Sequence, residues 1–108
     1  MTWVVIFRAK ARRLDAEYSA MATRLRTSAL SEFGCLAFYS FTEGEDEVAL
    51  SYWPDEDSIR RWRAHAEHLD AQRLGQERWY AHYRVEVAEI QRTYERVCAE
   101  GVTPAAPQ

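Results

Sequence analysis

Apolar residues recur with two different spacings along this chain, and the order of those spacings constrains the fold more than any other feature. Short runs of large and β-branched residues predict strands at residues 3–9, 36–42, 47–53 and 79–91. Spacings of three and four residues predict a helix from Asp15 to about Phe33, and a second helix that Asp55 caps and that continues through Leu69. The chain therefore runs strand, helix, strand, strand, helix, strand.

Turn signals separate these elements. Gly34 ends the first helix, the polar stretch 43–46 joins two strands as a hairpin, and Pro54 ends the strand before the second helix. A weaker helical pattern covers residues 93–100. This order predicts an α+β fold, a ferredoxin-like βαββαβ sandwich in which an antiparallel sheet carries both helices on one face.

The expected strands are apolar on both faces, although two helices can cover only one face of such a sheet. In the first strand Val5 and Phe7 point one way, while Val4 and Ile6 point the other way. The second and third strands repeat this pattern. A second copy of the same sheet is the simplest cover for the remaining face, and we therefore expect a homodimer, that is, a dimeric α/β barrel.

The composition indicates a single domain of residues 1–100, followed by a flexible tail at 101–108. The chain has 108 residues, of which 47% are hydrophobic and 29% charged, as in ordinary globular proteins. A net charge of -3 without a clustered basic face argues against nucleic acid as a partner. No apolar run approaches the ~20 residues that a membrane-spanning helix needs, so we expect no membrane partner.

The first residues, MTWVVIFRAK, lack the pattern of a signal peptide, and we expect a cytoplasmic protein. Cys35 and Cys98 lie far apart and match no metal-binding spacing, which is typical of free thiols in a reducing compartment. Cys35 at a helix-to-strand junction is either a thiol of low pKa or, as is commoner, an inert buried residue.

Four stretches of the second half carry a resemblance to a known family. They are Ala49 to Trp53, Ile59 to His68, Ala71 to Gly75 and Trp79 to Val87. Together with the Gly34-Cys35 step, they resemble the antibiotic biosynthesis monooxygenase family over about residues 3–92. The resemblance implies a dimeric α/β barrel with a ligand cavity between each sheet and its helices. It also implies one of two activities, cofactor-free oxidation of polycyclic phenols by O₂ or oxidative haem breakdown.

Haem breakdown is the less fitting of these two activities. The haem-degrading branch of the family uses an Asn in the first strand, a Trp on the second helix and a haem-ligating His about ten residues later. Trp62 matches the Trp, but Gln72 stands at the His position and the first strand has no Asn. Two of the three expected residues are therefore absent.

Residues 50–83 hold three of the four tryptophans and all three histidines. At ~100° per residue, His65 lies about 60° from Trp62 on the second helix, at the edge of its apolar stripe. His65 can therefore act as a general base, with Trp62 packing against a substrate ring. The alternative is a half-buried His65 bonded to a backbone carbonyl, and we expect His68 at the surface or in a dimer contact.

Strand residues supply further candidates for substrate binding. The hydroxyls of Tyr52 and Tyr83 can orient a ligand beside other aromatic side chains. Arg8 and Arg84 lie in otherwise apolar strands, where a guanidinium needs a carboxylate or an anionic ligand. The ordinary explanation is a structural ion pair with Glu47, Glu86 or Glu89. The alternative, a functional one, is that the guanidinium stabilises a phenolate.

The sequence predicts neither a metal site nor a bound cofactor. The His65 and His68 pair has no third ligand at metal-binding spacing, and no glycine-rich phosphate loop is present. We therefore expect a cofactor-independent monooxygenase that oxidises a phenol, a hydroquinone or an anthrone-like polyketide with O₂. The alternative is a dimeric α/β barrel that binds a small apolar molecule without chemistry.

Overall fold

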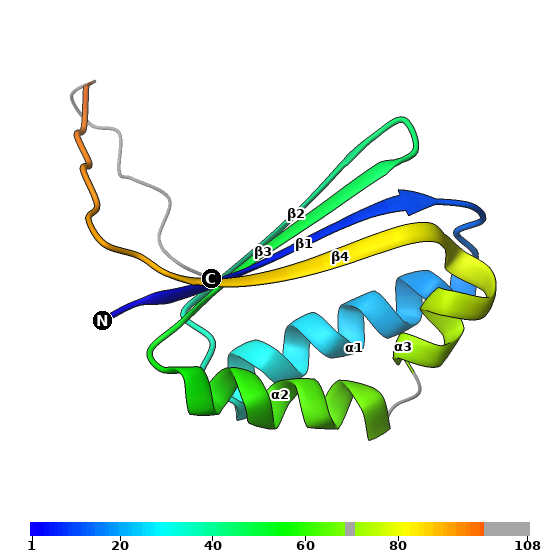
Figure 1. Ribbon diagram of the computed structural model, residues 1–108, viewed down its shortest axis with the longest axis horizontal. Coiled ribbons are helices and arrows are strands. Elements are labelled where there is room, and N and C mark those ends of the chain that lie inside the picture. The colour runs from blue at the N-terminus through cyan, green and yellow to red at the C-terminus, as the bar shows by residue number, and fades with distance from the viewer. Residues whose placement is uncertain (69–70, 99–108) are drawn as a thin grey trace.

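The computed structural model describes residues 1–68 and 71–98. Four antiparallel strands form one sheet in the order β2-β3-β1-β4, and the helices pack on one face of it (Figure 1). The elements are β1 (Trp3–Ala11), α1 (Ala16–Glu32), β2 (Ala37–Glu43), β3 (Asp46–Trp53), α2 (Glu56–His68), α3 (Ala71–Leu74), the π-helical turn η1 (Gly75–Trp79) and β4 (Tyr80–Glu89). The predicted α+β, ferredoxin-like fold is confirmed.

Side-chain caps begin both long helices where the sequence places them. The Asp15 carboxylate accepts the backbone N–H of Tyr18 at 2.9 Å, and that of Asp55 accepts the N–H of Ser58 at 2.7 Å. After α1, Gly34 adopts a φ of 80°, a left-handed conformation that glycine takes without strain. These local signals fix where α1 begins and ends and where α2 begins.

The hairpin between β2 and β3 is tighter than expected. Glu43 pairs directly with Asp46, so the loop consists of Gly44 and Glu45 alone rather than four residues. Gly44 has a φ of 59°, as a two-residue hairpin loop requires near its start. The extra pair of Glu43 and Asp46 extends the sheet one residue beyond Glu47, so Glu47 lies within the ladder and not at its end.

The segment between α2 and β4 differs from the expected picture. Its last part is the short helix α3 followed by η1, and β4 begins at Tyr80 instead of Trp79. Trp79 is 2% exposed and packs with Met21 and Leu74, so burial against α1 keeps it in the helical turn. Residues 93–98 form no helix, in contrast to the weak helical pattern, and the predicted tail at 101–108 lies outside the described residues.

The buried residues form two clusters on the helix side of the sheet. One contains Trp53, Phe38 and Ile59, and the other centres on Met21, Leu74 and Trp79. The larger cluster joins α1 and α2 to the middle of the sheet, where Trp53 is 0% exposed. Between the two clusters lies the cavity described below.

No helix covers the opposite face of the sheet in the described part of the chain (Figure 1). The strand register places a set of apolar neighbours there: Val4, Ile6, Tyr39, Phe41, Val48, Leu50 and Tyr52. We call this set the open face. Among the described helices, none combines the length and the apolar character that crossing a bilayer demands.

Candidate active site

A cavity of about 180 Å³ lies between the sheet and its helices. Residues of every strand, of α1 and α2, and of the η1 turn contribute to its wall, and both core clusters border it. Members that the argument below uses are Phe7, Tyr18, Glu47, Trp62, Trp79, Tyr80 and Tyr83. Most of the remaining wall is aliphatic or small, so the cavity is apolar apart from a few polar groups.

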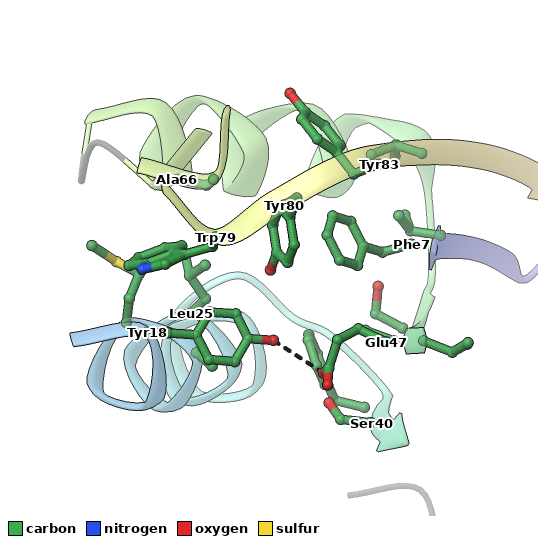
Figure 2. A pocket seen from close by; sticks show the side chains of 18 of the residues that line it. Phe7, Tyr18, Leu25, Ser40, Glu47, Ala66, Trp79, Tyr80 and Tyr83 are labelled. Carbon is green, nitrogen blue, oxygen red and sulfur yellow. Dashed lines mark hydrogen bonds between the residues drawn. The ribbon is translucent and has the colours of Figure 1, made fainter. Parts of the chain in front are cut away.

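Aromatic rings form one continuous wall of this cavity (Figure 2). The ring centroid of Tyr80 lies 5.3 Å from that of Phe7, 5.9 Å from that of Tyr83 and 6.0 Å from that of Tyr18. The Tyr18 ring in turn meets Trp79 edge-on at 5.3 Å. Rings at these distances and tilts give a stiff surface against which a flat ligand can stack.

One end of the cavity is polar because of Glu47. This residue is only 8% exposed, yet its carboxylate faces the helices. The Tyr18 hydroxyl donates to Oε2 at 3.2 Å, as Figure 2 shows, and the Thr42 hydroxyl donates to Oε1 at 2.7 Å. The carboxylate, which belongs to β3, is thus held in place by hydrogen bonds from α1 and from β2.

The hydroxyl of Tyr80 points toward the same cluster (Figure 2). Burial, and then a hydrogen bond with Tyr18, raise the pKa of Tyr80 above its usual range. Burial likewise raises the pKa of Tyr18, an effect that the hydrogen bond from Tyr80 partly opposes. Both phenols are therefore neutral at physiological pH, and the hydroxyls of Tyr80 and Tyr18 lie beside the Glu47 carboxylate, to which Tyr18 donates.

Gly75 in η1 lets the Tyr80 ring lie against the helical turn. A Cβ atom at this position would stand 3.0 Å from two carbons of the Tyr80 ring, which is closer than ordinary side chains approach. The glycine is therefore required for the place of Tyr80 in the cavity wall rather than for backbone conformation.

The structure brings two of the sequence-derived site residues into the cavity. Trp62 and Tyr83 line it, and the Trp62 indole also donates to the carbonyl of Leu25 at 3.1 Å, which ties α2 to α1. The Tyr83 hydroxyl points away from Glu47 and accepts a bond from Gln76 at 3.1 Å (Figure 2).

The other three candidates lie elsewhere. The half-buried His65 contacts the ring of Phe33, with ring centroids 5.2 Å apart and planes tilted by 39°, and it does not line the cavity. Tyr52 belongs to the open face and packs against Tyr39 at 6.2 Å, and Arg84 is on the same side of the sheet. The side chain of His68 lies outside the described part of the structure.

The strand arginines form ion pairs away from the cavity. Arg8 contacts Glu86 at 2.9 Å and Arg84 contacts it at 3.8 Å, so Glu86 is the carboxylate that the two guanidinium groups share. Because all three side chains are about half exposed, these pairs contribute little to stability. Glu47, another expected partner, faces the other side of the sheet.

The remaining reactive groups stay apart from the site. Cys35 is buried and donates to the carbonyl of Ala37 at 3.2 Å, and burial raises the pKa of its thiol, as expected of an inert cysteine. Cys98 is free and exposed. Among the side chains that the structure describes, which exclude those of residues 67–72 and 99–108, no group of three potential metal ligands occurs.

The sequence did not predict that Tyr18, Glu47 and Tyr80 lie together as a polar cluster. A signal for Glu47 exists, because strand alternation from Trp53 through Ser51 and Ala49 places residue 47 on the helix-facing side. A carboxylate at an inward position is uncommon without a partner or a function. Tyr18 gave no such signal, since an aromatic residue in a helical stripe is ordinary core.

Comparisons with known proteins agree with the fold described above. The uncharacterized protein YqjZ of Bacillus subtilis (strain 168) is 34% identical over 91 residues, which cover 83% of this chain and 80% of that protein. The structure of Rv0793 from Mycobacterium tuberculosis superimposes with a TM-score of 0.73 at 16% identity, covering 88% of this chain and 100% of the other. SnoaB, a cofactor-independent oxygenase from Streptomyces nogalater, gives a TM-score of 0.71 at 15% identity, covering 88% and 98%.

The two structural similarities concern the fold, whereas family membership rests on sequence. The sequence profile of the antibiotic biosynthesis monooxygenase family matches residues 3–74, two thirds of the chain, from the first strand through α3. The protein belongs to the antibiotic biosynthesis monooxygenase family.

Proposed function

We propose that the protein is a cofactor-independent monooxygenase that oxidises a small electron-rich aromatic compound with O₂. The observation that carries the proposal is the cavity itself, an apolar space walled by aromatic rings with a buried carboxylate at one end. Such a space takes a flat apolar ring and orients it through one polar substituent. Membership of a family of monooxygenases and the likeness to the cofactor-independent oxygenase SnoaB support the same reading.

The volume of the cavity favours a small substrate. An engineered apolar cavity of roughly 150 Å³ is known to accept benzene. The cavity here measures about 180 Å³, so it suits one aromatic ring, or two fused rings after modest adjustment. Among the substrates considered above, phenols and hydroquinones therefore fit better than an anthrone-like polyketide.

The reaction needs no electron donor besides the substrate. A phenol and O₂ give a quinone and water, in which one oxygen atom enters the ring and the other leaves in water. The protein contributes a dry pocket, ring contacts from Trp62 and Tyr83, and a polar group that handles the hydroxyl proton. In this proposal Glu47 is better placed than His65 for that last role, because Glu47 lines the cavity and His65 does not.

We further propose that the working form is a homodimer, with the open face of one sheet packed on that of its twin. No helix within residues 1–68 and 71–98 covers the apolar neighbours of the open face, and Phe41 is 59% exposed. Burying such a surface contributes roughly 25 cal/mol per Å² of apolar area. This pairing would leave the cavity on the outer side of each sheet, closed by that chain's own helices.

Oxygen consumption tests the oxygenase. The purified protein is mixed with one- and two-ring phenols and hydroquinones while O₂ uptake and quinone absorbance are followed. Ala49→Phe fills the cavity opposite Phe7 and should abolish uptake, whereas Ala64→Phe adds the same side chain at an exposed position of α2 and should not. If the wild type binds these compounds, as judged by quenching of Trp62 and Trp79, but consumes no O₂, the protein is a binding module and the oxygenase proposal fails.

A further inference from the structure

Glu47 is a buried carboxyl group that forms no salt bridge with any of the described residues. It is 8% exposed and stands between Ala9 of β1 and Thr42 of β2 on the helix side of the sheet. Its described side-chain partners are two hydroxyls, from Tyr18 and Thr42. Moving a carboxylate out of water without a countercharge costs free energy. A neutral side chain could connect α1 to β3 at a lower cost, so a purely structural role does not explain a glutamate at this position.

The carboxylate also has unused capacity. Its two oxygens offer about four acceptor sites, and the two hydroxyls occupy one site on each oxygen. The two donor hydroxyls belong to α1 and β2, and Glu47 itself is part of the cavity wall. A ligand hydroxyl in the cavity can therefore donate to Glu47 without breaking either existing bond.

We propose that Glu47 is the catalytic residue that binds the phenolic hydroxyl of the substrate and accepts its proton during oxidation. This inference rests on the oxygenase function proposed above and adds the identity of the recognised group. Tyr18 and Thr42 act as positioning residues, because they fix the carboxylate while the ring stacks against Phe7, Tyr80 and Tyr83.

The acidities of the two groups decide when the proton moves. A phenol is a much weaker acid than a carboxylic acid, so a neutral phenol that donates a hydrogen bond to a carboxylate keeps its proton. Removal of one electron turns the phenol into a strong acid, and a carboxylate is then a sufficient base. Glu47 therefore accepts the proton as the electron leaves for O₂, and the ground-state complex contains a neutral phenol on a carboxylate.

The remaining steps balance. Electron transfer gives superoxide, a phenoxyl radical and protonated Glu47, and a carbon–oxygen bond then forms between the ring carbon para to the hydroxyl and superoxide. Glu47 returns its proton to the outer peroxide oxygen. This proton transfer restores the carboxylate. The hydroperoxide then loses water, whose hydroxyl comes from cleavage of the O–O bond and whose other hydrogen comes from the para C–H bond, and the quinone remains. The substrate supplies all electrons that reduce O₂.

Binding of a nitrophenol tests the recognition step without any turnover. The neutral and ionised forms of a nitrophenol have different absorption spectra, and they interconvert near neutral pH. The binding of each form to the protein can therefore be measured separately. Wild-type protein should bind the neutral form and reject the phenolate, because the Glu47 carboxylate accepts a hydroxyl proton but repels an anion. Glu47→Gln should lose this preference. Glu45→Gln removes a charge from the same hairpin at an exposed position and should behave as wild type.

Turnover of an accepted phenol tests the proton transfer. Removing a general base should lower kcat by roughly 10²–10⁴-fold, with a smaller change in KM, so Glu47→Gln should show this loss. Glu47→Asp keeps the charge and must retain the preference for the neutral phenol even though its shorter side chain slows the reaction. A Glu47→Gln variant with wild-type kcat, or a Glu47→Asp variant that binds phenolate, overturns the role of Glu47.

The two proposals can fail separately. If the wild type oxidises phenols but Glu47→Gln does so equally well, the oxygenase stands and Glu47 is only a tether between α1 and β3. If no phenol is oxidised, yet the preference for neutral nitrophenol depends on Glu47, the oxygenase and the proton transfer are wrong while hydroxyl recognition by Glu47 is upheld.

Discussion

The indole Nε1 of Trp79 donates a hydrogen bond of 3.2 Å to Oδ1 of Asp15, the residue that caps α1. The same carboxylate accepts the N–H of Tyr18 and pairs with Arg78 at 2.7 Å. One side chain thus begins the first helix and holds the turn that leads into the last strand. Because Tyr18 and Trp79 both line the cavity, Asp15 also fixes the distance between two of its walls.

Acid should weaken this junction. The hydrogen bond with Arg78, and then that with the N–H of Tyr18, lower the pKa of Asp15 from its usual 3.8. The associated stability is present above pH 3.8 and is lost as the pH falls through the lower, folded-state pKa. Asp15→Asn should therefore unfold more easily than wild type at neutral pH, and the difference should shrink below pH 3.8 in urea titrations.

The exposed carboxylate of Glu43 provides a control for that experiment. Glu43→Gln removes one charge from the end of β2 without a cap or an indole contact. A stability difference between wild type and Asp15→Asn that stays constant from pH 7 to pH 2 would show that the charge of Asp15 is not what holds the junction.

Gly75→Ala should disturb the cavity without unfolding the protein. Alanine in a helical turn is favoured over glycine by up to about 1 kcal/mol, but its Cβ would press on the Tyr80 ring at 3.0 Å. We expect little change in Tm and a loss of at least several-fold in affinity for small phenols, measured by quenching of Trp79. Equal affinity in variant and wild type would mean that the Tyr80 ring is free to shift.

Alkaline titration should separate the tyrosines. Burial raises the pKa of Tyr18 and of Tyr80 above the ordinary value of 10.0. The stability that these neutral hydroxyls contribute is therefore fully present below pH 10.0, and it is lost as the pH rises through the pKa values of the folded state. Tyrosinate absorbance should rise in two stages, with the late stage coinciding with loss of circular dichroism. Tyr80→Phe should reduce the late stage.

A matched variant checks that assignment. Tyr94 is 87% exposed, so Tyr94→Phe should reduce only the absorbance change that the folded protein already shows. The same effect from Tyr80→Phe would mean that the Tyr80 hydroxyl reaches solvent in the native state.

Sedimentation at low micromolar concentration should show one species near twice the chain mass of 12.6 kDa. Leu50→Lys places a charge in the middle of the open face, beside Ile6 and Tyr39, and should shift the protein toward monomer and lower its Tm. Thr23→Lys adds the same charge at an exposed position of α1 and should leave the dimer intact. A folded wild-type monomer would contradict the barrel arrangement.

Local signals account for most of the fold. The caps Asp15 and Asp55, the glycines after α1 and in the hairpin, and the spacing of apolar residues each act within a few positions, so they can be read from the chain directly. The same spacing placed Trp62 on the inward-facing side of α2, whereas the hydroxyls of Tyr52 and Tyr83 made both of them candidates and only Tyr83 lines the cavity. The spacing failed at Trp79, because a buried tryptophan in a strand and one in a helical turn look alike in sequence.

The polar end of the cavity depends on contacts that no local pattern encodes. Tyr18, Glu47 and Tyr80 come from three distant segments, and they meet only because α1 packs over the end of β3 while Gly75 admits the Tyr80 ring. Whether His65 enters the cavity depends in turn on how α2 is rotated, which the bond from Trp62 to Leu25 sets. The sequence alone therefore determined the elements and their inward faces. Only tertiary packing decided which polar groups share the cavity, because side chains remote in the chain meet through the geometry of the assembled layers.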